Sequence, residues 1–287
     1  MHERNTCLEN EQHKVIWILG ENGRLANAVY QEFKDERPLK IGRQDYLKWL
    51  DLSVADLEAY LRKNLPPKSI IFITAGIVDK SVNSQVLEQV NVLLPIKILE
   101  ASKNLDLTTV TIGSISEHFM FFDDLYITSK RDLSDHIETH TYLQNNLHVR
   151  LHTLYGGSAP PHLNMFLGKA FESIQNRREF RMSSGKQLRE YHHVHDVARA
   201  IRLRLKENHF GVWDLNTGIP IRLIDLAKAI FLSYDLEELI TVSREKDLEG
   251  DNLTHVFPET ISELGIEMRD PTQGVISYLH SMDGDKN

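Results

Sequence analysis

The chain has 287 residues, 41% of them hydrophobic and 26% charged, which is the composition of an ordinary soluble globular protein with a well-buried core. Its formal net charge of −8 argues against a nucleic-acid partner, because binding a phosphate backbone needs concentrated Lys and Arg. The single cysteine, Cys7, excludes an intrachain disulfide. We expect a cytoplasmic protein with no membrane partner, because the polar N-terminus is no signal peptide and no stretch approaches the roughly 20 apolar residues of a membrane helix.

Short apolar runs alternate with helical patterns through the first half of the chain. Strands are predicted at 14–19, 39–41, 69–74, 108–112 and 147–152. Helices are predicted at 24–34, 54–63, 83–103 and 124–144, with Ser53 as the N-cap of the second. Short, nearly all-apolar strands that alternate with helices indicate an α/β fold with a doubly wound parallel sheet.

The pattern becomes looser after residue 155, where glycines and prolines mark a loop over 156–161. Beyond it we predict helices near 164–175, 196–206 and 222–233, and extended segments at 179–182 and 188–194. The tail over 281–287 is expected to be frayed. We therefore predict a nucleotide-binding Rossmann domain over 1–155 and a smaller α/β substrate-binding region over 156–287, with some interleaving.

A glycine turn follows the first predicted strand, with G-x-x-G-x-x-A spacing from Gly20 to Ala26. Glycines let the backbone turn tightly and let a pyrophosphate approach the helix N-terminus, whose unpaired N–H groups and dipole favour an anion. An ordinary strand-to-helix turn is the alternative, but the position between first strand and first helix favours a dinucleotide site. The candidate cofactor-binding residues of the turn are Gly20, Asn22, Gly23, Arg24 and Leu25.

The choice of cofactor depends on the end of the second strand. An acidic residue there would accept a hydrogen bond from a ribose 2′-hydroxyl, whereas a basic one suits a 2′-phosphate. The sequence has Arg43 and no acid, so NADP(H) is preferred and NAD(H) is possible. A solvated surface arginine is the alternative reading of Arg43. Asp51 and Leu52 stand where a third strand is expected to end, near the adenine.

Tyr126 and Lys130 form a Y-x-x-x-K pair, whose members share one face of a helix. A lysine ammonium one turn away is expected to lower the pKa of the phenol and make it a usable acid or base near neutral pH. By itself the spacing is also that of a surface pair. The loop before it supplies Ser114, which could donate a hydrogen bond to the substrate oxygen that the tyrosine contacts.

Several motifs in order resemble the extended branch of the short-chain dehydrogenase/reductase superfamily, the NAD-dependent epimerase/dehydratase family acting on nucleotide sugars. The resemblance covers roughly 14–232 and implies a Rossmann fold. The segments that carry it are GENGRLA (20–26), ITAG (73–76), NV with LLPIKILEAS (91–102), YITSK (126–130), VRLHTLYGG (149–157), LREYHHVHDVARAI (188–201) and WDLNTGIPIRLIDLAKAI (213–230).

The resemblance implies roles around the cofactor. Tyr126 would be the general acid/base, and Lys130 would bind the nicotinamide ribose. Ala75 and Gly76 would line the cofactor, and Asn91 would support the sheet behind it.

On the substrate side, the resemblance implies that Arg189 pairs with the substrate diphosphate and that Asn164 contacts its nucleotide. Thr153 stands where the family has asparagine. The catalytic hydroxyl is open between Ser114 and Ser116, because one match to the family segment puts Ile115 at the usual position.

We therefore expect an NADPH-dependent reductase of a nucleoside-diphosphate 4-keto-(6-deoxy) sugar. The alternatives are a nucleotide-sugar 4-epimerase with NAD, a dehydratase, for which Glu117 is the nearby candidate acid, and an inactive dinucleotide-binding sensor or scaffold. A homodimer through the helices at 83–103 and 124–144 is expected by analogy. No metal is expected, since His192, His193 and His195 have no Cys or clustered carboxylates beside them.

Overall fold

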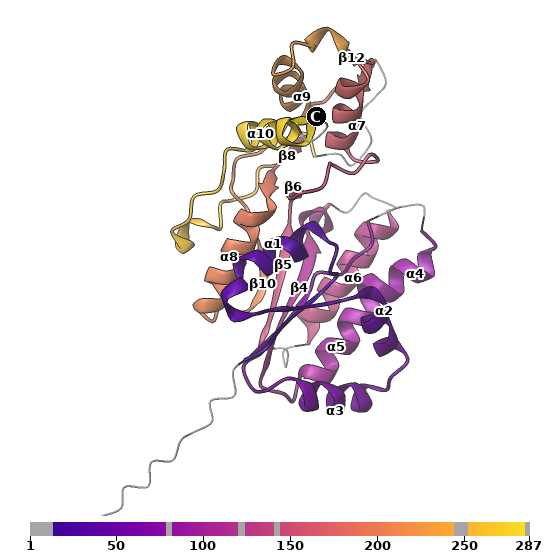
Figure 1. The fold of residues 1–287 in the computed structure, drawn as a ribbon, viewed down its shortest axis with the longest axis vertical. Helices are drawn as coiled ribbons and strands as arrows, with labels where there is room; N and C mark the ends of the chain where they lie inside the picture. The colour runs from indigo at the N-terminus through magenta and orange to yellow at the C-terminus, as the bar shows by residue number, and fades with distance from the viewer. Residues whose placement is uncertain (1–13, 79–81, 120–123, 141–143, 244–251, 285–287) are drawn as a thin grey trace, which may run out of the picture.

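A parallel sheet forms the base of the molecule in the computed structural model, which describes residues 14–78, 82–119, 124–140, 144–243 and 252–284 (Figure 1). Its six strands lie in the order β10-β5-β4-β3-β1-β2, and every neighbouring pair is parallel. The strands are β1 (Ile16–Leu19), β2 (Leu39–Ile41), β3 (Ser69–Ile73), β4 (Leu107–Ser114), β5 (Asn146–Leu151) and β10 (Gly211–Asp214). The predicted Rossmann-type α/β class is confirmed.

Helices cover both faces of this sheet because alternate strand residues are buried on opposite sides. In β1, Ile16 and Ile18 belong to one apolar core, and Trp17 and Leu19 belong to another. The first core includes side chains of α1 (Arg24–Glu32) and α8 (Val194–Lys206), which pack together. The second core includes side chains of α3 (Val54–Asn64) and α5 (Leu94–Ser102), and α6 (Leu125–Thr139) contacts α5. The predicted N-cap is confirmed, since the Ser53 side chain accepts from the Asp56 N–H.

Two predicted elements differ in the structure. The third strand expected to end at Asp51 and Leu52 is absent, because Leu47–Leu50 form a 3₁₀ turn that buries Trp49 against Trp17, at 5.9 Å between ring centroids. The helix predicted over 83–103 is divided into α4 (Ser84–Glu88), a π-helical turn (Gln89–Leu93) and α5. Pro95 has no N–H to donate to the carbonyl four residues earlier, and the wider turn accommodates that lost bond.

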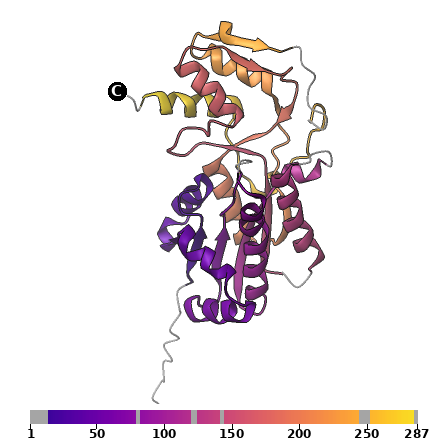
Figure 2. The same cartoon turned by 90° about the vertical axis from the view of Figure 1, so that its right-hand side faces the viewer.

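A second, smaller part, here called the cap, stands over the carboxyl ends of the strands (Figures 1 and 2). It has its own apolar core. Its helices are α7 (Phe166–Gln175), α9 (Leu223–Leu232) and α10 (Pro271–Gly284), and its short strand pairs are β6–β9 (Thr153–Tyr155, Tyr191–His193), β8–β11 (Leu188–Arg189, Ile221–Arg222) and β7–β12 (Phe180–Met182, Ile240–Val242).

The chain passes more than once between the sheet part and the cap. Both α8 and β10 follow cap segments in sequence, yet they pack on α1 and on β5. The sequence predicts a frayed tail from residue 281. That prediction is wrong for 281–284, because α10, which buries Tyr278 and Leu279, continues to Gly284. A domain boundary near residue 155 stays a prediction. In the described ranges, no helix combines the length and the apolar character needed to cross a membrane.

Candidate active site

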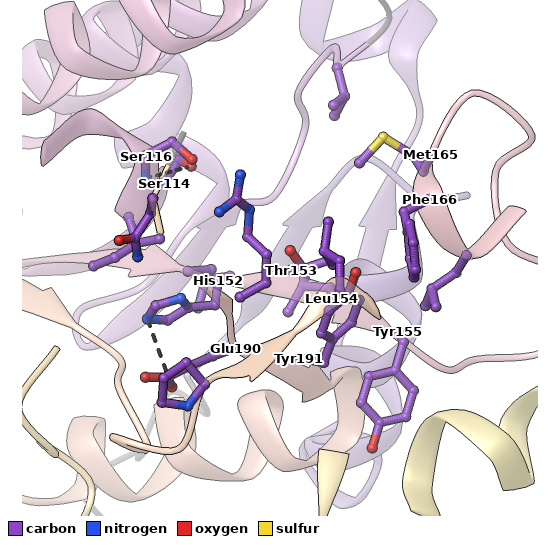
Figure 3. Close-up of a pocket in the computed structure, with 18 of the residues that line it drawn as sticks. Ser114, Ser116, His152, Thr153, Leu154, Tyr155, Met165, Phe166, Glu190 and Tyr191 are labelled. Carbon is purple, nitrogen blue, oxygen red and sulfur yellow. Dashed lines mark hydrogen bonds and ion pairs between the residues drawn. The ribbon is translucent and has the colours of Figure 1, made fainter. Parts of the chain in front are cut away.

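A cavity of about 920 Å³ lies between the carboxyl ends of β4 and β5 and the cap. Figure 3 shows Ser114 and Ser116 at one side of it and Met165 and Phe166 at the other, with Thr153 between them. The predicted site residues that line this cavity come from distant parts of the chain: Arg24, Ser114, Ser116, Tyr126, Thr153, Asn164 and Arg189. The fold therefore brings most of the predicted catalytic and substrate-binding groups to one place, whereas Lys130 is buried behind Tyr126 and does not line the cavity.

Helix α6 presents the Tyr–Lys pair. Its N-cap, Asp124, accepts a hydrogen bond from the Tyr126 N–H at 2.9 Å, which fixes the start of the helix at the cavity. One turn later, Lys130 Nζ donates to the Ile112 carbonyl at 2.8 Å and lies 5.9 Å from the centre of the Tyr126 ring. A Cβ on Gly76 would lie 3.7 Å from this ammonium, so Lys130 stands between the tyrosine and the segment after β3.

Burial determines the ionisation of the pair. Burial and the nearby Glu117 carboxylate raise the pKa of Tyr126 to about 12, although a hydrogen bond with Ser114 acts in the opposite direction. Burial also lowers the pKa of Lys130 to about 8, against the influence of Glu117. The expected lowering of the phenol pKa is therefore wrong for this structure, because loss of solvent and the nearby carboxylate both favour the neutral phenol. Tyr126 is a protonated acid at neutral pH.

The two candidate serines differ in their contacts. Ser114 ends β4, is buried, and shares a hydrogen bond with the Tyr126 phenol. Its side chain also accepts the Ser116 N–H at 3.2 Å. Ser116 lines the cavity and is partly exposed, and Ile115 between them is buried. Of the two hydroxyls, Ser114 has the described contact with the tyrosine.

A buried polar group behind Ser114 is here called the sheet-side cluster. Its centre is Glu117, whose Oε1 accepts the Ser114 N–H at 2.6 Å and whose Oε2 accepts Arg150 Nε at 2.8 Å and the Ser134 hydroxyl. His148 continues the cluster, with Nε2 2.8 Å from the Ser134 hydroxyl. Glu117 is 6% exposed and does not line the cavity. Its carboxylate is therefore held away from any bound substrate.

A second buried group, the cap-side cluster, lies on the other wall, and sequence reasoning missed it. Glu190 accepts hydrogen bonds from the Thr217 N–H and hydroxyl, both at 2.7 Å, and from His192 Nε2 at 3.0 Å. Despite burial, these bonds and the nearby His152 lower the pKa of Glu190 to about 2. His152 Nε2 lies 2.9 Å from Asn216 Oδ1 and 3.8 Å from the Glu190 carboxylate (Figure 3). The motif segment at 188–201 is the signal that could have indicated Glu190.

The glycine turn has the shape that a dinucleotide phosphate needs. Gly20 has φ of +96°, and a Cβ there would lie 3.1 Å from the Ala75 backbone. A Cβ on Gly23 would lie 3.1 Å from the Gly20 carbonyl, and Gly23 caps α1 without a side-chain hydrogen bond. The first N–H groups of α1 are thus open to an anion. The turn fits the diphosphate of a nicotinamide dinucleotide.

Arg24 begins α1 and connects the glycine turn to the cap. Its Nη1 donates to the carbonyls of Gly156 and Ala159, at 2.6 and 2.8 Å, and to the Tyr278 hydroxyl at 2.7 Å. Nη2 donates to the Pro160 carbonyl. The guanidinium therefore makes contacts between the two parts of the molecule, while its role toward a cofactor stays a prediction.

The remaining predicted cofactor residues lie along the same edge of the sheet. Arg43 is exposed and begins a short helix directly after β2. Glu21, which sequence reasoning missed, comes close to the same strand end, since a Cβ on Gly42 would lie 3.1 Å from its Oε1. Asn91 is buried and bonds both backbone groups of Ile77, at 2.8 and 2.9 Å, beyond Ala75 and Gly76.

Three contacts describe the predicted substrate residues. The Thr153 N–H donates to the Glu190 carbonyl at 3.2 Å. Arg189 Nη1 donates to the Leu188 carbonyl at 2.8 Å, and the Asn164 N–H meets His162 Nδ1 at 3.3 Å. All three residues line the cavity, and they come from β6, β8 and the loop before α7.

This combination of fold and site agrees with sequence comparison. A family model described as the NAD dependent epimerase/dehydratase family matches residues 8–218, so the chain belongs to this family of NAD(P)-dependent enzymes. No curated protein matches the chain in sequence.

Solved structures share the fold at low sequence identity. A UDP-N-acetylglucosamine 4-epimerase from Methanobrevibacter ruminantium aligns with a TM-score of 0.76 and 15% identity, over 95% of this chain and 99% of that one. A dTDP-glucose 4,6-dehydratase from Streptomyces venezuelae, solved with NAD and TYD, gives 0.76 and 14%, over 95% and 98%. A dTDP-4-dehydrorhamnose reductase from Clostridium acetobutylicum gives 0.70 and 16%, over 94% and 99%. Three different reactions on one fold leave the particular reaction to the site itself.

Proposed function

We propose that the protein is an NADPH-dependent reductase of a nucleoside-diphosphate 4-keto-(6-deoxy) sugar. One observation carries the proposal: Tyr126 is a protonated acid that shares a hydrogen bond with Ser114 at the cavity, while Glu117 is fixed behind them by Arg150. Reduction of a carbonyl needs a proton donor beside the oxygen. Elimination of water needs a further acid or base facing the sugar, which Glu117 does not provide.

The chain's own groups have defined tasks in this reaction. NADPH bound at the glycine turn would supply the hydride. Tyr126 Oη gives its proton to the substrate oxygen, and the Ser114 hydroxyl donates a hydrogen bond to the same oxygen as negative charge develops. The Lys130 ammonium stabilises the tyrosinate that results. Arg189 and Lys169, which line the cavity, are cations suited to a substrate diphosphate.

The cofactor preference rests on two side chains at the end of β2. Arg43 stands two residues after the end of this strand and supports a 2′-phosphate, hence NADPH. Glu21 approaches Gly42 at the same place and would instead accept a hydrogen bond from a ribose 2′-hydroxyl, hence NADH. NADH is therefore the second candidate cofactor, and a comparison of the two reduced cofactors decides between them.

A 4-epimerase is the second candidate reaction, because the same Tyr–Lys pair serves it and an epimerase is among the similar folds. It predicts copurifying NAD and no net oxidation of added cofactor. An inactive dinucleotide-binding scaffold is the candidate outside catalysis, and it predicts that Tyr126→Phe leaves the biological role unchanged.

The test is a reductase assay with purified protein. NADPH or NADH is mixed with a panel of nucleoside-diphosphate 4-keto-6-deoxy sugars, and loss of the reduced-nicotinamide absorbance is followed. We expect turnover with at least one sugar and a loss of about a hundredfold or more in Tyr126→Phe. Interconversion of 4-epimers without loss of absorbance, or no turnover with any sugar, would overturn the proposal. A homodimer and a cytoplasmic location stay predictions.

A further inference from the structure

A group of metal-binding side chains lies outside the cavity, at the C-terminal end of α6. His136 and His140 are four residues apart there, and Glu100 faces them from α5, which lies beside α6 (Figure 1). One ligand atom from each residue lies within 4.8 Å of the other two. The His136 Nε2 to Glu100 Oε1 distance is 3.6 Å, and the two imidazole centroids are 4.0 Å apart. All three residues are half-buried, so their side chains are already restricted.

The hydrogen bonds of His140 select the tautomer that a metal needs. Its Nδ1 lies 2.6 Å from the His136 carbonyl oxygen. Because a carbonyl can only accept, Nδ1 carries the hydrogen, and the lone pair of the neutral ring is on Nε2. A backbone carbonyl bonded to one ring nitrogen is the usual partner that orients a metal-bound histidine.

His136 supplies a second observation that points to a ligand. Its Nε2 is buried and has no hydrogen-bond partner among the described residues, although Glu100 is near. A buried polar atom without a partner costs free energy, and a bound cation would satisfy it.

The donor set determines which ion fits. Two imidazole nitrogens and one carboxylate oxygen suit Zn²⁺ and its neighbours in the first transition row, whereas Mg²⁺ and Ca²⁺ prefer oxygen ligands. Lys103 contacts the other oxygen of Glu100, Oε2, at 3.1 Å, which leaves Oε1 directed at His136. Rotation of these side chains would bring the donors to the roughly 2.0–2.2 Å that Zn²⁺ requires.

We propose that Glu100, His136 and His140 bind a Zn²⁺ ion that joins the end of α6 to α5. The ion would restrain α6, the helix that presents Tyr126 and Lys130, without touching the substrate. These two residues precede His136 by ten and six positions in the chain. The expectation of no metal considered His192, His193 and His195 only. The H-x-x-x-H spacing was readable in the sequence, but the carboxylate ligand comes from another helix and needed the fold.

Zinc binding to tag-free, chelator-treated full-length protein tests the proposal. Titration calorimetry with ZnCl₂ should give one ion per chain and a higher melting temperature, and CoCl₂ should give the visible absorption of a low-coordinate Co²⁺ site. His136→Ala and His140→Ala should each weaken Zn²⁺ binding by at least about tenfold and abolish the Co²⁺ band.

Two further variants keep the test decisive. Glu100→Gln retains the side-chain shape and should weaken Zn²⁺ binding while circular dichroism shows an intact fold. His209→Ala removes an exposed histidine that also contacts a carboxylate, Glu207, and should leave binding unchanged. Zinc binding that survives in the His136→Ala/His140→Ala double variant, or wild-type protein that binds no Zn²⁺, would overturn the proposal. Neither outcome depends on the proposed reductase activity.

Discussion

One buried carboxylate stands behind the sheet side of the cavity and another lines its cap side, and the partners of the two differ. On the sheet side, Glu117 is bonded to the Arg150 guanidinium, and so forms an ion pair behind Ser114. On the cap side, Glu190 is bonded to backbone N–H groups of Thr217 and Gly218 and to His192. The first carboxylate balances a charge next to the proposed chemistry, and the second organises a loop. We therefore expect Glu117 to influence the rate of reaction and Glu190 to influence substrate affinity.

Replacing Glu117 should have the largest effect. Glu117→Gln removes the most buried of the carboxylates that pair with Arg150, and should lower the free energy of unfolding by about 3 kcal/mol. It should also lower kcat more than it raises KM, because the Ser114 N–H loses a charged acceptor. Urea unfolding and steady-state kinetics measure both effects. The control is Glu138→Gln, a half-exposed partner of Arg150, which should cost under about 1 kcal/mol.

Glu190→Gln should have a smaller effect of a different kind. The amide oxygen can still accept from the Thr217 N–H, so the expected loss of stability is about 2 kcal/mol. KM should rise while kcat changes little, because we propose that this wall holds the substrate and that the acid lies on the other side. Kinetics on the same sugar panel measure the two constants. A fall in kcat at unchanged KM would remove the distinction between the two carboxylates.

The pH dependence of reduction sharpens the assignment of the sheet side. The pKa of Lys130 is lowered to about 8 and that of Tyr126 is raised to about 12. The lysine therefore loses its proton first as pH rises, and with it the charge that stabilises the tyrosinate. kcat for reduction should be level below about pH 8 and should fall above it. A rate that stays constant to about pH 10 would contradict this role of Lys130.

Acid titration separates the histidine and carboxylate contributions to stability. Burial lowers the pKa of His148 from 6.5 to about 3. As the pH decreases below 6.5, the unfolded chain therefore binds a proton at His148 before the folded protein does, and the free energy of unfolding falls. The pKa of Glu190 is lowered to about 2, so its contribution is present above 4.5 and is lost between 4.5 and 2.

The variant His148→Asn isolates the first contribution. Removing the buried imidazole should flatten the loss of stability between pH 6.5 and 4.5 by about 1.4 kcal/mol per pH unit. Urea unfolding at several pH values measures this slope. An unchanged slope in His148→Asn would show that other groups, such as His152, whose pKa burial lowers to about 4, cause the acid loss.

A third carboxylate, Glu21, extends the comparison to an exposed position and should give the smallest effect. Glu21→Gln removes a negative charge beside the end of β2 and should raise the preference for NADPH over NADH by a few fold, about 1 kcal/mol or less. Arg43→Gln is the matched opposite change and should lower that preference. The ratio of kcat/KM with the two cofactors measures both. Equal ratios in all three proteins would exclude this edge from cofactor selection.

Local patterns in the sequence were enough to predict most of the strands and turns in the sheet part of the molecule. The glycine turn, the strands and the Ser53 cap are set by neighbouring residues, and the structure has them within a few positions. The predictions that failed concern features that depend on contacts between residues far apart in the sequence. Trp49 turns inward to meet Trp17, which replaces the expected third strand, and the position of Glu100 beside His136 depends on how α5 and α6 pack.

The site was predictable as a set of residues and less so as a set of ionisation states. Ser114, Tyr126 and Arg189 meet at one cavity, as an ordered series of motifs predicts. The Y-x-x-x-K spacing carries no information on burial, which reverses the expected direction of the Tyr126 pKa. Glu190 and Glu21 lie inside recognised motifs, but only the fold brings them to the cavity wall and to the end of β2.

The contacts of Arg24 also bear on how the chain reaches this fold as it is synthesised. Arg24 bonds Gly156 and Tyr278, which follow it by 132 and 254 residues. β10 completes the sheet from residues 211–214, and α8 covers α1. The first helix therefore obtains its last described partner only after residue 278 has left the ribosome, so the N-terminal half waits incomplete while the residues between are synthesised. Such dependence on distant contacts predicts slow folding and exposed apolar surface along α1 in the nascent chain.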